Sequence, residues 1–184
     1  ENIDQFFDAP WPLHAIIDEI DDLKVKILLR IHARRRKIPV LMVTDLGDDV
    51  MLDVERFDLD PNLPLFHGLV DGVEELLEKD VEKREWLKQA TTIIGPKYAP
   101  LRLQQAIAQI GHELATQPQL GGTAVMAGSV LAYAVRKIAL GAELRSGRTI
   151  ISLDSHLLES HDSDEYKRIH KESTEMLERA LGII

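Results

Sequence analysis

The chain has 184 residues, a hydrophobic fraction of 45% and a formal net charge of −9. This length suits one domain with its own core, and the hydrophobic content excludes an intrinsically disordered chain. The excess of acids argues against a general nucleic-acid binder, because such proteins neutralise phosphates with basic surface. The absence of cysteine excludes disulfides, thiolate zinc sites and a thiol nucleophile. Since no apolar run approaches the roughly 20 residues of a membrane span and no signal peptide is visible, we expect a cytoplasmic protein.

Residues 13–44 predict a strand–helix–strand unit on which the rest of the chain is organised. The apolar run 13–17 has strand length, and an amphipathic helix with an acidic start and a basic end follows it. Pro39 then stops the helix and leads to a second strand at 40–44. Such a unit connects parallel strands, and ligands of parallel sheets bind outside the carboxyl ends of the strands. Four acids lie at that position: Asp18, Glu19, Asp21 and Asp22.

The remaining pattern predicts a hairpin, a helical region and a long apolar helix. The turn signal at 46–49 should return a strand at 50–54 antiparallel to its predecessor. Further expected elements are helices at 67–93 and 101–116, a hinge at Gly121-Gly122, a buried core helix at 124–140, a strand at 149–153 and a helix at 164–181. The predicted fold class is α/β, with a Rossmann-like, mostly parallel sheet, an antiparallel hairpin and a helical insertion over residues 67–119.

Two separated blocks resemble the ThiF/MoeB/HesA family of ubiquitin-activating-type adenylating enzymes. Residues 15–26, AIIDEIDDLKVK, are similar to that family's strand ending in Asp-x-x-Asp-Asn, followed four residues later by a basic residue. Residues 128–154 resemble its late core helix, which begins with Gly-Ser and leads through Ser-Gly to a strand closing on Asp. The positions that match in the first block are Asp18, Asp21, Asp22 and Lys26. The two blocks span most of this chain but only the second half of the family's domain.

The resemblance implies an ATP-dependent adenylyltransferase that activates the C-terminus of a protein or peptide as an acyl-adenylate. Asp21 matches the aspartate that holds magnesium, and Lys26 matches a basic position near the nucleotide, so these are the expected catalytic residues. Asp18 and Asp22 are the expected cofactor-binding residues. Magnesium suits such a group because it typically binds one or two carboxylates plus phosphate oxygens. The expected cofactors are ATP and magnesium, and the expected partners are a small carrier protein or peptide and a second copy in a homodimer.

The chain also departs from that family. No GxGxxG loop follows a first strand, so no nest of backbone N–H groups for phosphates is expected. Asp22 stands where the family has Asn, and neither a thioester cysteine nor a zinc-binding cysteine pair is present. We therefore expect residues 1–184 to be a partial ThiF-like domain, a fragment of a longer adenylating protein. The alternatives are a non-catalytic dimerisation or scaffold module derived from that fold, and a different nucleotide-binding or reductase-type Rossmann protein.

Several polar residues have a structural interpretation that competes with a functional one. Asp21 or Asp22 could cap the helix that follows, since aspartate is favoured at that position. The histidines near the C-terminus do not have the spacing that places two metal ligands on one helical face. We expect these groups to be turn residues (Asp48, Asp49), residues of a solvated strand face (Asp53, Glu55, Asp58) and exposed histidines (His156, His161, His170).

Overall fold

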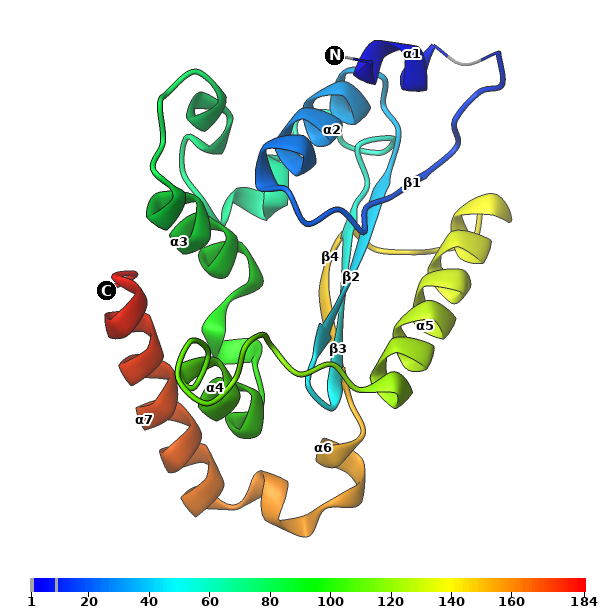
Figure 1. The fold of residues 1–184 in the computed structure, drawn as a ribbon. Helices are drawn as coiled ribbons and strands as arrows, with labels where there is room; N and C mark the ends of the chain where they lie inside the picture. The colour runs from blue at the N-terminus through cyan, green and yellow to red at the C-terminus, as the bar shows by residue number, and fades with distance from the viewer. Residues whose placement is uncertain (1, 9) are drawn as a thin grey trace.

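The structure is a computed structural model that describes residues 2–8 and 10–184, and its fold is α/β (Figure 1). Its four-stranded open sheet has the order β1-β2-β3-β4, and helices cover both faces. The strands are β1 (Ile16–Ile17), β2 (Val40–Leu46), β3 (Asp49–Glu55) and β4 (Gly147–Ser152). The α-helices are α1 (Ile3–Phe7), α2 (Leu23–Arg35), α3 (Lys83–Ile94), α4 (Leu101–Ala108), α5 (Gly121–Ala139), α6 (Asp154–Leu157) and α7 (Asp164–Leu181). Short 3₁₀ segments are η1 (Leu65–Gly68), η2 (Val73–Leu77), η3 (Pro96–Tyr98) and η4 (Glu159–Asp162).

The sheet is mixed, so the expected mostly parallel sheet is wrong. Strand β1 pairs parallel to β2, while β2–β3 and β3–β4 pair antiparallel. The hairpin was correctly predicted, because the short turn at Gly47 permits only an antiparallel return, and Gly47 adopts a φ of 67°. Residues 56–146 then return the chain to the free edge of β3, where β4 also pairs antiparallel. A single parallel pair therefore remains, formed by the strand–helix–strand unit.

Helix α2 lies against the sheet as expected and has the predicted basic last turn, but its first turn contains none of the expected acids. Leu23, Ile27 and Ala33 are buried in one cluster with Val40 of β2. The helix begins after Asp22, whose side chain accepts a hydrogen bond from the Val25 N–H at 3.2 Å. A side-chain N-cap of this kind stabilises a helix by about 1 kcal/mol. The helix therefore has a fixed start at Leu23, shortly after β1 ends at Ile17.

The helical insertion contains less helix than the sequence predicts. In place of helices at 67–93 and 101–116, the structure has α3, the shorter α4 and several 3₁₀ segments. Gly68, Gly72 and Gly111 adopt positive φ angles of 73°, 62° and 86°, which are incompatible with a continuing right-handed helix. Leu103 of α4 packs with Met42 and Met51 on the sheet face opposite α5.

Helix α5 covers the other face of the hairpin (Figure 1). Ala127 and Ala134 are buried against the alternate, apolar residues of β2 and β3. The predicted buried core helix is wrong in one respect, since Val125 is 72% exposed and Leu140 is 69% exposed. Gly121 and Gly122 are the first residues of this helix and not a separate hinge. Within the described residues, no helix is long and apolar enough to cross a membrane.

The C-terminal elements follow the prediction closely. Strand β4 covers most of the expected strand, and α7 has the predicted bounds. Helix α7 packs against α4, where the Gln104 amide donates to the Thr174 hydroxyl at 2.8 Å. The last helix therefore lies on the same side of the sheet as α3 and α4 (Figure 1).

Candidate functional site

The end of β1 places the predicted acids at the edge of the sheet. The parallel ladder continues past the strand, because the Asp18 N–H donates to the Leu41 carbonyl at 2.8 Å. The chain then turns through residues 19–21, and Asp22 caps α2. Consequently the Asp18 side chain is buried, and the Asp22 side chain is hydrogen-bonded to the first turn of α2. The exposed Asp21 lies between them in the sequence.

Asp18 belongs to a buried ionic cluster beneath α2. Its Oδ2 accepts from Arg30 Nη1 at 2.5 Å, and its Oδ1 accepts from Lys26 Nζ at 3.1 Å. Asp18 and Arg30 have no exposed surface. Burial raises the pKa of Asp18, but the Arg30 guanidinium and the Lys26 ammonium outweigh it and hold that pKa below its ordinary value. The carboxylate therefore stays charged and holds both cations in place.

Arg30 links Asp18 to Glu55 of β3 and so connects this cluster to the sheet. Its Nε donates to Glu55 Oε2 at 2.5 Å, and Glu55 Oε1 accepts from the Phe66 N–H at 2.7 Å. Phe66 has a positive φ of 51° and its ring lies 4.1 Å from the Arg30 guanidinium carbon. Because Asp18, Arg30 and Glu55 are buried and paired, removal of one of them leaves an uncompensated charge.

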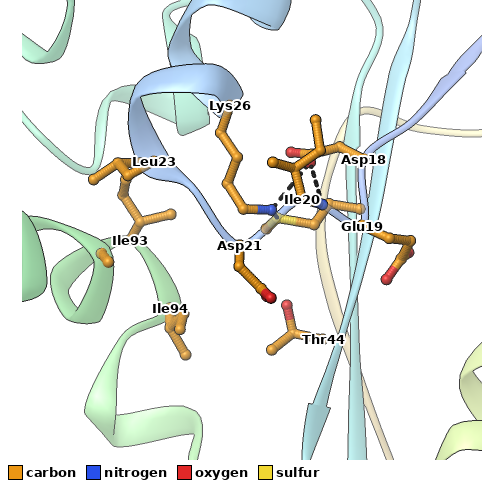
Figure 2. A pocket seen from close by; sticks show the side chains of 11 residues that line it. Asp18, Glu19, Ile20, Asp21, Leu23, Lys26, Thr44, Ile93 and Ile94 are labelled. Atoms are coloured by element: carbon orange, nitrogen blue, oxygen red, sulfur yellow. Dashed lines mark hydrogen bonds and ion pairs between the residues drawn. The ribbon is translucent and has the colours of Figure 1, made fainter.

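A cavity of about 210 Å³ opens beside Lys26, between the start of α2, the sheet and α3. Figure 2 shows Lys26 reaching Asp18 on one side of it, while Leu23, Ile93 and Ile94 form the apolar side. The Asp21 side chain points toward Thr44 of β2 (Figure 2). The cavity thus combines an apolar wall with the exposed carboxylates of Glu19 and Asp21 and one ammonium group.

Asp21 also lies at the junction of this cavity with neighbouring hollows. A hollow of about 530 Å³ extends from Glu19, Asp21 and Thr44 to the first turns of α5. Another hollow runs from Asp21 along the start of α2 to Trp86 of α3. Among the described residues, no hydrogen bond or ion pair engages the Asp21 carboxylate, so both of its oxygens remain available to a ligand.

A second buried cluster surrounds Asp53 of β3, on the same face of the sheet as Glu55. Asp53 Oδ2 accepts from two of the three Arg148 nitrogens, Nη2 at 2.6 Å and Nε at 3.0 Å, and Asp53 Oδ1 lies 2.6 Å from His67 Nε2. Burial lowers the pKa of His67, but the bond to Asp53 and its charge outweigh this and raise the pKa above its ordinary value. The expected solvated strand face is therefore wrong: Asp53 is 2% exposed and Glu55 1%. The sequence feature that could have indicated this burial is the position of Asp53 and Glu55 within an otherwise apolar strand.

The other competing interpretations have mixed outcomes. Asp22 is the helix cap, whereas Asp49 is not a turn residue, because it begins β3 and is 5% exposed. His156 is exposed as expected, but His170 donates from Nε2 to the Ala99 carbonyl at 2.8 Å and is half-buried. Over residues 2–8 and 10–184, no group of three or more His, Cys, Asp or Glu side chains could hold a metal ion. A metal at Asp21 would therefore need oxygens from a ligand or from water.

The fold and this geometry define an α/β protein with a candidate ligand site at the carboxyl end of the β1–α2–β2 unit. No family model and no solved structure matches the chain. Among curated proteins, it is similar to "Uncharacterized protein MT1398" of Mycobacterium tuberculosis (strain CDC 1551 / Oshkosh), with 32% identity over 157 residues. The match covers 85% of this chain and 21% of that protein, so the chain spans about a fifth of the length of this curated relative.

Proposed function

We propose that this chain supplies the magnesium-binding side of an ATP-dependent adenylating site of the ThiF type, within a Rossmann-like fold. The observation that carries the proposal is the position of Asp21. Its exposed carboxylate lies at the carboxyl end of the parallel strand pair, where three hollows meet. The proposed substrate is the C-terminal carboxylate of a small carrier protein or peptide.

Asp21 suits a magnesium ion bound through a single carboxylate. Such an ion keeps several waters and takes its remaining ligands from phosphate oxygens, so one unengaged aspartate is enough protein coordination. The Thr44 side chain, toward which Asp21 points, could hydrogen-bond to a water in the ion's shell (Figure 2). Bound magnesium would neutralise phosphate charge while the acyl-adenylate forms.

Lys26 is the cationic group of the proposed site. Its Nζ is held by Asp18 and lies 3.5 Å from Met42 Sδ, so the ammonium faces the cavity in a fixed position. We assign Asp18 the role of positioning Lys26, because the buried Asp18 carboxylate is already paired with two cations. Asp22 acts through the helix start that it caps.

The phosphates and base of ATP would need further binding groups. The described residues include no glycine-rich strand–loop–helix, and Lys26 is the one basic side chain that lines the cavity of Figure 2. In this proposal, those groups come from elsewhere in a longer polypeptide or from a second copy. The length of the curated relative is compatible with a longer polypeptide.

The proposal is tested by ATP–pyrophosphate exchange, measured with the longest natural polypeptide that contains these residues and with a panel of C-terminal peptides. We expect exchange in the wild type and a loss of about 100-fold or more in Asp21→Ala, as for removal of one electrostatic group from an active site. Asp80→Ala, another exposed aspartate, is the matched control and should keep full activity. Exchange that survives Asp21→Ala unchanged would contradict the assignment.

A non-catalytic dimerisation module is the second candidate, and the outer face of α5 favours it. Val125, Tyr133 and Leu140 are exposed there, and β4 forms an edge of the sheet. Exposed apolar side chains beside a free strand edge are typical of association surfaces. Light scattering tests this candidate: we expect a dimer at micromolar concentration that Tyr133→Glu converts to a monomer, whereas a wild-type monomer would exclude it.

A further inference from the structure

A second cavity, of about 300 Å³, lies between β3, β4, η3 and α7. It shares no lining residue with the cavity at Asp21. Its volume equals that of about ten waters in the liquid, which suits a small organic molecule. Elements from distant parts of the sequence enclose it, and the proposed adenylation uses none of them.

An unsatisfied buried carboxylate lies in the wall of this cavity. Asp49 is 5% exposed, and its Oδ1 has no hydrogen-bond partner among the described residues. Burial raises the pKa of Asp49 and outweighs a hydrogen bond with the Ser152 side chain, which lowers it; the nearby Asp154 charge acts in the same direction as burial. Buried polar atoms are nearly always hydrogen-bonded, and an unpaired one is unfavourable. The missing partner of Asp49 is a hydrogen-bond donor.

Two lysines bring positive charge to the same cavity. Lys97 of η3 is exposed and has no ion-pair partner in the part of the chain that the structure describes, while Lys167 of α7 lies 3.5 Å from the exposed Asp162. A simple cation at Asp49 would leave Lys97 without a counter-ion, and a simple anion would leave the Asp49 oxygen unsatisfied. The charges therefore favour a ligand that carries both signs.

The remaining wall is mostly aromatic, with Pro100, Ile150 and the exposed Asp162 beside the rings. Tyr98 and Ile150 line it. The Tyr166 ring is stacked on His170, with 5.9 Å between the ring centroids, and is tilted against His161, with 4.8 Å between them. His170 is fixed by the Ala99 carbonyl, at 2.8 Å. Such a wall provides contact area for a hydrocarbon or aromatic body between the charged groups.

We propose that this cavity binds a small zwitterion whose primary ammonium donates to Asp49 and whose carboxylate pairs with Lys97. The ligand's apolar body contacts Tyr98 and Ile150. An α-amino acid is the simplest member of this chemical class. The proposal is independent of the adenylating function, because the two cavities have no residue in common.

Isothermal titration calorimetry of the 184-residue chain tests the charge requirement. The probes are glycine, leucine and phenylalanine, with 3-phenylpropionate and phenethylamine as analogues of phenylalanine that each lack one charged group. We expect phenylalanine to bind at least about tenfold more tightly than either analogue, as for loss of one hydrogen bond to a charged group. Equal binding of an analogue, or no zwitterion binding below a Kd of about 1 mM, would overturn the proposal.

Variants of the two charged contacts test the residue assignment. We expect Asp49→Asn and Lys97→Gln each to weaken phenylalanine binding by about tenfold. Asp71→Asn is the matched control and should leave binding unchanged, because the exposed Asp71 does not line this cavity. Asp49→Asn removes an unpaired charge and should unfold at or above the wild-type temperature; if it does not fold, the exposed Lys97→Gln decides. Folded variants that bind as tightly as the wild type would refute the assignment.

Discussion

Alternate residues of β3 lie on opposite faces of the sheet, and the two faces are buried in different ways. Toward α5, Val50, Leu52 and Val54 form an apolar cluster with the hairpin partner and the helix. Toward α2 and the insertion, the same strand presents Asp53 and Glu55, both paired with arginines. One seven-residue strand thus combines a face stabilised by apolar area with a face stabilised by charge pairing.

The two faces should also differ in how strictly they determine the positions of the residues that pack against them. Apolar burial is roughly proportional to area and tolerates a shift of partners. A buried ion pair adds little net stability, but each charge depends on its own partner in a particular position. The charged face fixes α2 and the turn at Phe66 and His67, and its Asp18 also orients Lys26 at the candidate site.

The largest expected effect comes from breaking the charged face at Arg30. Arg30→Met leaves Asp18 and Glu55 buried without their shared partner, so we expect a loss of about 3–5 kcal/mol in the free energy of unfolding. Urea denaturation followed by circular dichroism measures it. The triple change Asp18→Asn, Arg30→Met and Glu55→Gln removes all three charges and should recover most of the loss. A loss below about 1 kcal/mol in Arg30→Met would show that the cluster is not closed to water.

A slightly smaller effect is expected on the apolar face. Leu41 is fully buried under α5, so Leu41→Ala should lower the free energy of unfolding by about 2–5 kcal/mol. The loss should be the same at pH 5 and pH 8, since no titrating group belongs to this cluster. Val125→Ala, on the exposed side of α5, is the control and should change stability by less than about 0.5 kcal/mol. A loss of stability in Leu41→Ala that differed between pH 5 and pH 8 would contradict the description of this face as purely apolar.

The smallest effect is the pH dependence of the second charged cluster. His67 faces Asp53, with Glu55 and Arg148 nearby, and its pKa is raised in the folded state. Its stabilising contribution is therefore complete below the unfolded pKa of about 6.5 and is lost as the pH rises through the folded pKa. The stability difference between wild type and His67→Gln should shrink on that rise. A difference that stays constant from pH 5 to pH 9 would contradict this assignment.

At acidic pH, the free energy of unfolding should depend on Asp53 in the opposite direction: the stabilising contribution is lost as the pH falls. Burial raises the pKa of Asp53, but His67 and Arg148 outweigh it, so the folded pKa lies below the ordinary value. The contribution of Asp53 is therefore present above its unfolded pKa of about 3.9 and is lost as the pH falls through the folded pKa. In urea titrations between pH 2 and pH 5, the free energy of unfolding of Asp53→Asn should depend less on pH than that of the wild type. An unchanged pH dependence would assign it to other carboxylates.

The sequence by itself determined the local features of this protein. The β1–α2–β2 unit, the hairpin around Gly47, strand β4 and helix α7 each have a signal within a short window, such as a cap, a glycine turn or an apolar period. The carboxyl edge with Asp21 followed from the same unit. These elements were predictable because the interactions that set them join residues close in sequence.

Tertiary structure alone decided which polar residues are buried and where the cavities lie. Asp53 and Glu55 resembled a solvated strand face because Arg148 and Arg30, which neutralise them, come from distant segments. Asp49 likewise resembled a turn residue until α7 and η3 enclosed it. The antiparallel pairing of β4 with β3 depended on the route of residues 56–146. For Asp53 and Glu55 the physical reason is that a buried charge needs a partner to compensate its desolvation, and a local pattern cannot specify a partner that lies far away in the sequence.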